Sequence, residues 1–244
     1  MNKKIIFFFI IFLTTIVANS QIDDPRVFRR DLTFQDELTF GGKLSTNGWG
    51  FDIRRGYFVD LRHKYFFEGG FNVIHHPKEY KISSVYFLFR NFVYGKINEC
   101  YDMKLGYGRQ LTLYQKKDLG SIEIRLIAST GADIAMLKPI YYIVINNNIE
   151  QTSKFDVAMQ PATIERKAKF SKGLNEITLH PGIYLKLGLN FEFGVRSTKI
   201  KALEIGAGLD VIPMGLSIMA SNPNQILFPN LYLNFSFGKR FNKY

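Results

Sequence analysis

The chain has 244 residues, of which 46% are hydrophobic and 22% charged, and its formal net charge is +11. A mean hydropathy of −0.05 excludes a bundle of membrane-spanning helices, and no window after the N-terminal segment approaches about 18 uninterrupted apolar residues. The basic residues are scattered and form no arm or run, which argues against a nucleic-acid partner. A single cysteine, Cys100, excludes an internal disulfide.

The N-terminus has the pattern of a secretory signal peptide. Two lysines, Lys3 and Lys4, precede an apolar run from Ile5 to Val17, and small residues stand at Ala18 and Ser20. We expect cleavage between Ser20 and Gln21, so that 1–20 is the signal peptide. A retained anchor is the alternative, but a span needs about 20 apolar residues. Residues 21–37 are charged and aperiodic and are interpreted as a periplasmic N-terminal segment.

Strict alternation of apolar and polar residues is the strongest pattern in the chain. It holds without a break over 183–194, 203–211 and 231–238. A two-residue period places the two sets on opposite faces of a strand. One face is almost purely apolar, and the other carries charge and glycine, which is typical of a strand with lipid outside and a polar lumen inside. The fold class predicted is therefore all-β: a single-domain, closed, antiparallel transmembrane β-barrel over 38–244.

The number of strands is the open question. Clear or partial alternation predicts strands at 38–45, 49–57, 65–73, 85–97, 103–113, 122–137, 183–194, 203–211 and 231–238. A barrel with both termini in the periplasm needs an even number. Residues 139–146, with the β-prone run Tyr141–Ile145, supply a tenth strand. The alternative merges this run with 122–137 and loses one weak strand, which gives eight. Ten strands are favoured over eight.

This arrangement also predicts which connections lie outside the cell. The polar stretch 147–179 is expected to be extracellular, and 195–199 a short periplasmic turn. Short periplasmic turns and long outer loops are the usual asymmetry of such barrels.

Charges of both signs are expected to face the lumen. The predicted inward set is Lys43, Arg54, Lys104, Arg125 and Lys186 against Asp52, Glu68, Glu123, Glu192, Glu204 and Asp210. A barrel of this size has an interior just wide enough for side chains to fill. Opposite charges there are expected to pair and close the lumen, whereas a narrow porin needs a lining of one dominant sign.

Two arginines interrupt faces that otherwise point to lipid. Arg55 and Arg109 are expected near a membrane edge, because Arg at the bilayer midplane costs about 2–4 kcal/mol. The sharper alternative is a flank covered by a protein partner, and the apolar run 87–89 hints at the same.

No motif assigns an enzymatic activity. His75 and His76 with Glu79 resemble a ligand set, but neighbouring strand residues face opposite ways, and we interpret them as polar loop residues. His180 has no Ser or Asp partner at a readable spacing. The sequence contains no nucleophile elbow, phosphate loop or zinc motif. We therefore assign no catalytic, cofactor-binding or metal-binding residue and expect no cofactor.

Several segments resemble one family. The signal peptide ending in Ala-Asn-Ser-Gln is similar to those of Bacteroidota, and the segments 105–110, 137–142, 170–174, 182–188 and 201–204 resemble a family of small, mostly uncharacterised outer-membrane β-barrel proteins of that phylum. The resemblance implies a signal-cleaved barrel in the outer membrane of a Gram-negative cell, acting as an accessory subunit in protein assembly or secretion. One departure is that Tyr244 is out of phase with Phe235, Phe237 and Phe241.

The function expected is a non-catalytic accessory or scaffold subunit of an envelope protein complex. Its expected partners are other outer-membrane or envelope proteins, together with anionic lipid head groups or lipopolysaccharide phosphates. An outer-membrane enzyme acting on lipid or lipopolysaccharide and a narrow porin remain the alternatives.

Overall fold

The structure is a computed structural model, and it describes residues 36–60, 62–83, 91–116, 121–146, 149–157, 159, 161–194, 198–220 and 224–241. Eight antiparallel strands close into a barrel in the order β1-β13-β12-β11-β7-β6-β3-β2. They are β1 (Asp36–Ser45), β2 (Gly48–Phe58), β3 (His63–Ile74), β6 (Asn98–Tyr114), β7 (Glu123–Pro139), β11 (Thr178–Glu192), β12 (Lys199–Leu216) and β13 (Gln225–Phe241). Among the described residues, no helix is long and apolar enough to cross a membrane.

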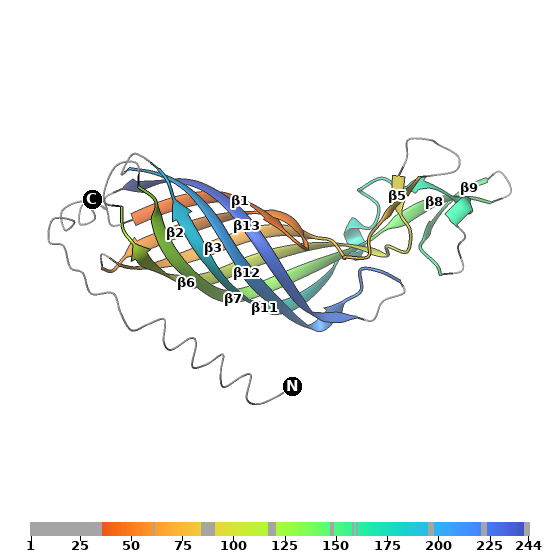
Figure 1. Cartoon of the computed structure of the whole chain (residues 1–244). Helices are drawn as coiled ribbons and strands as arrows, with labels where there is room; N and C mark the ends of the chain where they lie inside the picture. The colour runs from red at the N-terminus through yellow and green to blue at the C-terminus, as the bar shows by residue number, and fades with distance from the viewer. Residues whose placement is uncertain are drawn as a thin grey trace, which may run out of the picture.

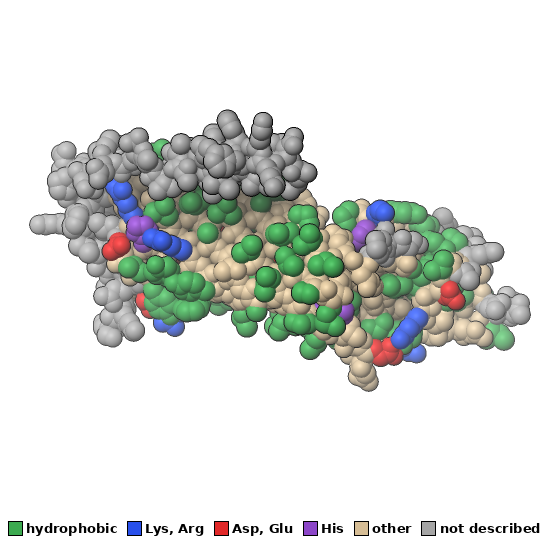
Figure 2. All heavy atoms as spheres, turned by 90° about the horizontal axis from the view of Figure 1, so that it is seen from below, with side chains coloured by type: hydrophobic (Ala, Val, Ile, Leu, Met, Phe, Trp, Pro, Cys, Tyr) green, Lys and Arg blue, Asp and Glu red, His purple; other side chains and the backbone are tan. Residues whose placement is uncertain are grey.

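The barrel wall is apolar outside and polar inside, as the sequence alternation predicts. Along β13, for example, Leu231, Leu233 and Phe235 are exposed, whereas Tyr232 and Asn234 between them are buried. Hydrophobic side chains are spread over the barrel surface in Figure 2, and charged ones appear at one end and on the lobe at the other. In a folded chain such a surface needs an apolar surrounding, so the fold class is that of a transmembrane β-barrel.

The two ends of the barrel differ (Figure 1). At the termini end β1 begins and β13 ends, and the connections 59–62, 115–122 and 193–198 are short. At the other end, the described residues of 75–97 and 140–177 form a lobe beyond the barrel, which we call the head. It contains the sheets β4 (Lys81–Ser83) with β5 (Asn91–Val93) and β10 (Ile164–Lys167) with β8 (Tyr141–Asn146) and β9 (Ile149–Lys154). Two short 3-10 helices, η3 (Pro161–Thr163) and η4 (Leu174–Glu176), complete it.

The head has a hydrophobic core of its own. Phe92, Ile140, Tyr142 and Ile164 are buried together. The Tyr142 hydroxyl donates a hydrogen bond of 2.8 Å to the carbonyl oxygen of Lys96, which belongs to the other long connection. The two long connections therefore fold as one unit.

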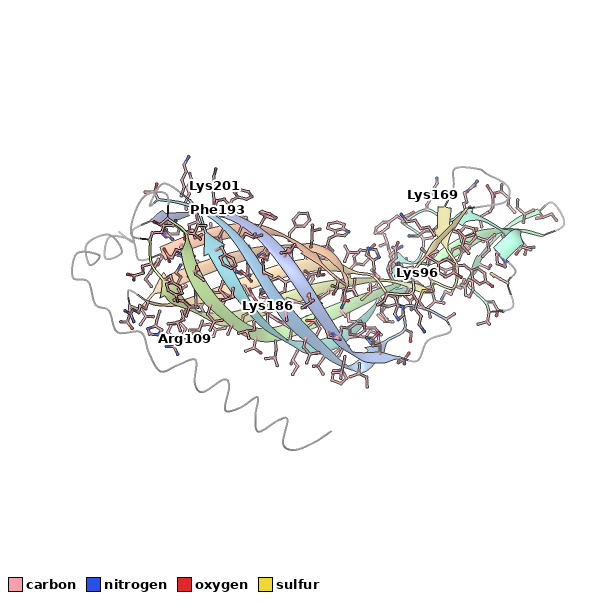
Figure 3. The ribbon with its side chains drawn as sticks, viewed as in Figure 1. Lys96, Arg109, Lys169, Lys186, Phe193 and Lys201 are labelled. Atoms are coloured by element: carbon pink, nitrogen blue, oxygen red, sulfur yellow. The ribbon has the colours of Figure 1, made fainter. Side chains whose placement is uncertain are left out.

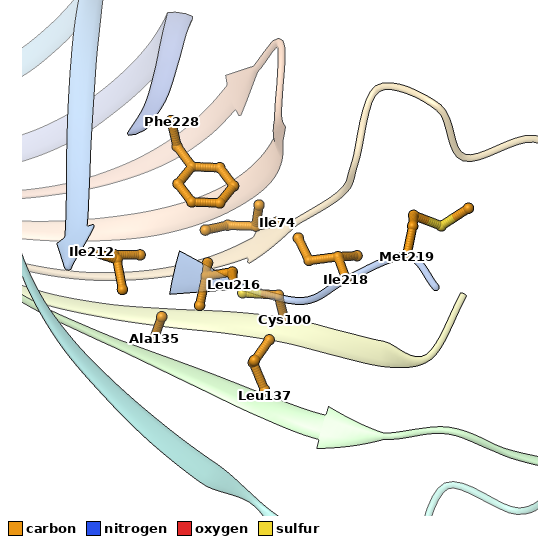
Figure 4. Packing of buried hydrophobic residues seen from close by; sticks show 9 residues of the cluster. All are labelled: Ile74, Cys100, Ala135, Leu137, Ile212, Leu216, Ile218, Met219 and Phe228. Carbon is orange, nitrogen blue, oxygen red and sulfur yellow. The ribbon is translucent and has the colours of Figure 1, made fainter. Parts of the chain in front are cut away.

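A second apolar cluster closes the head end of the lumen (Figure 4). We call it the plug, and it consists of Ile74, Cys100, Ala135, Leu137, Ile212, Leu216, Ile218, Met219 and Phe228. Residues 217–220 lie across the mouth, where the Ile97 amide donates a hydrogen bond to the Ile218 carbonyl at 3.0 Å. Cys100, the single cysteine of the chain, is 1% exposed and packs in this plug.

The strand number is eight, the smaller of the two that the sequence left open, and the preference for ten was wrong. Residues 139–146 form β8 of the head rather than a tenth barrel strand. Pro139 ends β7 and has no N–H to continue the ladder, and the apolar residues that follow are buried in the head's core. In the expected strand 85–97, the described part contains only the three-residue β5 and the bridge at Lys96.

Other expectations fall elsewhere. The signal peptide, most of the lead-in 21–37, the apolar run 87–89 and Tyr244 lie outside the described residues. The barrel begins at Asp36 rather than 38, and β7 continues to Pro139, two residues beyond the expected strand end at 137. The described residues of 149–177 lie in the head, at the end of the barrel opposite the termini, whereas 178 and 179 belong to β11; that this end is extracellular stays a prediction.

The first testable consequence is spectroscopic. The purified protein in detergent should give an all-β circular dichroism spectrum and a folded band that migrates differently from the heated one on a gel, because a closed strand ladder resists detergent at room temperature. A mainly helical spectrum would contradict the fold.

Candidate functional site: a closed ionic lumen and an outer head

Charged side chains fill the barrel in layers. All eleven charged residues predicted to face inward do so, and Lys186 lies at mid-height in Figure 3. Sequence reasoning missed six more: Glu37, Lys64, Asp102, Lys116, Asp133 and Arg240. Glu37, Lys64, Asp102 and Arg240 fell just beyond the expected strand ends. Asp133 shares the inward phase of Arg125 and was available from the alternation.

Arg54 is the centre of the middle layer. Its guanidinium binds both carboxylate oxygens of Glu204, its Nε lies 3.0 Å from Glu68 Oε2, and Asp52 is 3.4 Å away. The Arg54 side chain is only 8% exposed. Fork-shaped pairing of this kind satisfies several guanidinium donors at once and offsets the cost of removing the charges from water.

Neighbouring groups complete the pairing of these carboxylates. Glu68 accepts further bonds from Lys186 at 2.7 Å and from the Tyr184 hydroxyl at 2.8 Å. Glu204 accepts one from the Tyr232 hydroxyl at 2.8 Å. Six strands therefore share one network, because Arg54, Glu68, Ser129, Tyr184, Glu204 and Tyr232 come from β2, β3, β7, β11, β12 and β13.

A second group of ion pairs closes the termini end. Glu192 lies between Arg125, Arg240 and Lys116, with distances of 2.5 Å to Arg240 Nη2 and 3.0 Å to Lys116 Nζ. Lys64 and Glu37 form a further pair at 2.5 Å. The cavities between these layers hold about 20 Å³ or less, near the volume that one water needs. In the described part of the chain there is thus no continuous aqueous path.

The layer beneath the plug has an excess of negative charge. Asp102, Asp133 and Asp210 each offer an oxygen within 4.8 Å of the others. Lys104 lies between two of them, paired with Asp210 and 3.3 Å from Asp102. Neither oxygen of Asp133 accepts a hydrogen bond from a described residue. Among the described residues, these three carboxylates have the spacing that best suits a hard cation such as Ca²⁺ or Mg²⁺. The Lys104 ammonium, however, already neutralises part of their charge.

The predicted edge arginines lie on the outer wall toward the termini end. Arg55 pairs with Asp36 at 3.2 Å and its side chain is 52% exposed. Arg109 is exposed and lies 5.8 Å from the centre of the Tyr65 ring. Both positions agree with the expected membrane edge.

The histidines form no shared site among the described residues. The Glu79 carboxylate links residues at the start of the head. It accepts hydrogen bonds from the His75 ring at 3.3 Å, the His76 amide at 2.9 Å and the Lys96 ammonium at 2.8 Å. Partial burial alone raises the pKa of Glu79, but these donors outweigh burial and lower that pKa to about 2. His180 lies apart on β11, with Nε2 at 3.2 Å from Thr178 Oγ1.

Comparison with known proteins gives a likeness of fold. No family model matches the chain, and no curated protein matches it. Among solved structures it is similar to the Neisserial surface protein A, with a TM-score of 0.42, 9% identity and coverage of 85% of this chain and 97% of that one. It is also similar to Ail, the attachment invasion locus protein of Yersinia pestis, with a TM-score of 0.41, 8% identity and coverage of 86% of this chain and 99% of that one. The N-terminal β-barrel domain of Pseudomonas aeruginosa OprF is similar with a TM-score of 0.38, 9% identity and coverage of 86% of this chain and 98% of that one.

The class of protein follows from the barrel itself. A closed antiparallel barrel of eight strands with an apolar wall and a charged, filled lumen is a transmembrane β-barrel. The affiliation with Bacteroidota stays a prediction.

Two adjacent arginines give a matched test of the lumen network. We expect Arg54→Met to lower the free energy of unfolding by about 3–5 kcal/mol, because it removes the cation that pairs with the buried Glu204 and leaves Glu68 with Lys186 as its cationic partner. Arg55→Met removes an exposed pair and should cost at most about 1 kcal/mol. Urea unfolding of both variants in vesicles measures the difference. Equal effects would show that the network does not stabilise the barrel.

The acidic layer, which consists of Asp102, Asp133 and Asp210, gives different expectations for variants of Asp133 and Asp210. Asp133→Asn should leave the unfolding midpoint unchanged or raise it, because neither oxygen of the buried Asp133 carboxyl accepts a hydrogen bond from a described residue and an amide can donate to Asp102. Asp210→Asn removes the partner of Lys104 and should cost about 1–3 kcal/mol. A loss at Asp133 as large as that at Asp210 would mean that Asp133 holds a cation.

Proposed function

We propose that this chain is an outer-membrane β-barrel that acts as a non-catalytic accessory subunit of an envelope protein complex, of the kind that assembles or secretes proteins. The observation that carries the proposal is the division of the molecule: the barrel is filled and closed, while the head is a folded unit with its own core. A barrel without a pore serves as an anchor, and a folded head held beyond it serves for contact with other molecules.

The filled lumen favours an anchor over a porin. The ion pairs around Arg54 and Glu192 and the apolar plug lie in series along the barrel. Ions crossing it would have to break several buried pairs and displace the plug, and each broken pair costs several kcal/mol.

The corresponding measurement is conductance in planar bilayers. The wild-type protein should show no stable open steps, because the described lumen is occupied at every level. Reproducible, long-lived steps would support the porin alternative. Heat-inactivated protein at the same concentration controls for bilayer damage.

The head surface suits protein contact. Ile149, Val157 and Phe170 are apolar and 61%, 69% and 57% exposed, on a unit whose strands already pair with one another. Apolar residues held on a folded support bind a partner with little additional ordering cost. Large connections of this kind more often serve binding than structure alone.

The partner test is mild-detergent purification of the tagged protein from its native cell, followed by mass spectrometry. Stoichiometric recovery of an assembly or secretion barrel is expected. The double variant Ile149→Ser with Val157→Ser should lose at least half of that partner, because it removes the apolar contact. The control Glu150→Gln with Gln151→Asn changes neighbouring residues of the same strand and should retain it.

Two outcomes would contradict this proposal. Recovery as a lone monomer under several mild detergents would remove the accessory role. Altered lipid A in a deletion strain, restored by the wild-type chain but not by His180→Ala, would favour the enzymatic alternative.

A further inference from the structure

The outer wall carries an unbalanced basic cluster at the termini end. Lys199 and Lys201 of β12 and Lys239 of β13 are exposed, and they alternate with the buried Ile200 and Ala202. They therefore face outward rather than into the lumen. We call these three residues the lysine surface. Figure 3 shows Lys201 at the end of the barrel, beside Phe193.

Two of these lysines face each other directly. Lys199 and Lys239 are register partners across the β12–β13 ladder, and Lys201 follows two residues along on the same face. Directly opposed residues have Cβ atoms about 5 Å apart, and like charges in this position are destabilising. None of the three forms an ion pair with a carboxylate in the described part of the chain. An anion from outside the chain would remove this cost.

Aromatic rings surround the lysine surface. Phe237 is the cross-strand partner of Lys201, and Phe193 donates its amide to the Lys201 carbonyl at 3.0 Å. Phe193, Phe237 and Phe241 are all largely exposed. Aromatic rings in a girdle mark the interface of a membrane barrel, where long basic side chains keep their charge in the head-group layer.

The lysine surface belongs to one side of the membrane. Arg55 and Arg109 lie on the outer wall toward the same end, and among the described residues only Arg55 of the two pairs with a carboxylate, that of Asp36. Toward the head, the exposed wall is apolar, as at Leu44, Trp49, Phe71, Met103, Ile134, Leu179, Met214 and Leu231. Lys138, at the junction with the head, is buried and paired with Glu99. The unbalanced positive charge of the wall therefore meets the leaflet at the termini end.

We propose that the lysine surface binds the phosphates of anionic phospholipids in the leaflet on the termini side, with the phenylalanine rings among the acyl chains. Each basic residue near an anionic leaflet adds attraction, and three within one patch place two or more phosphates side by side. The proposal rests on the proposed membrane location and not on any partner of the head.

The test compares the folded full chain in vesicles of phosphatidylcholine alone and of phosphatidylcholine with an equal part of phosphatidylglycerol. The anionic vesicles should raise the thermal unfolding midpoint by about 5 °C. The triple variant Lys199→Gln, Lys201→Gln, Lys239→Gln should lose most of this rise. At 1 M salt, where the Debye length is about 3 Å, the wild type should lose it too.

A matched control removes the same charge elsewhere. Lys81→Gln, Lys169→Gln and Lys172→Gln change three exposed head lysines and should keep the full rise. Inorganic phosphate added to phosphatidylcholine vesicles should not reproduce it, which separates lipid from free phosphate. A wild type indifferent to phosphatidylglycerol, or equal losses in the two triple variants, would overturn the proposal. Failure to insert into either vesicle would instead refute the membrane location, and the salt response of the wild type remains informative if the triple variant does not fold.

Discussion

The structure depends on the neutralisation of charge inside a narrow barrel. Eight strands leave an interior that side chains fill, and most of the inward charges are paired with a charge on another strand. Arg54 meets this constraint most fully, because one guanidinium holds Glu204 and Glu68 and stands beside Asp52. Glu204 lies 150 residues from Arg54 in the sequence, so this pair forms only when β12 and β2 come together in the closed barrel. The same contacts that stabilise the barrel also fill its lumen.

The plug completes what the ion pairs begin. The acidic layer of Asp102, Asp133 and Asp210 lies near the head end of the lumen, directly below apolar residues of the same strands. Its carboxyl groups are therefore largely removed from water. Ile212 and Ala135 each stand two residues from one of these acids. The apolar layer seals the mouth, and the connections above it are free to build the head. A filled barrel is thus compatible with an elaborate outer lobe.

The molecule is polarised in two ways. At one end the wall carries exposed lysines and aromatic rings, and at the other the wall is apolar up to the head. Because of this asymmetry, the two ends of the barrel wall are suited to different leaflets of a membrane. It also separates the region proposed to bind lipid from the region proposed to contact proteins, so the two proposals concern different parts of one chain.

The sequence by itself determined the class of fold and most of the lumen. A period of two residues, clearest over 183–194, 203–211 and 231–238, assigns inward and outward faces before any partner strand is known. The eleven inward charges followed from that alternation in these and the other predicted strands. Strand ends were less certain, because alternation does not mark where a ladder stops, and so Lys64 and Asp102 were missed.

Only the tertiary structure decided the strand number and the head. Residues 139–146 are as β-prone as a barrel strand, and nothing local tells whether their partner is the barrel or another connection. Pro139 and the burial of Ile140 and Tyr142 against Phe92 settle it, and Phe92 lies far away in the sequence. The opposition of Lys199 and Lys239 is likewise a matter of register. Register is fixed by the closure of the whole barrel, which no single segment encodes.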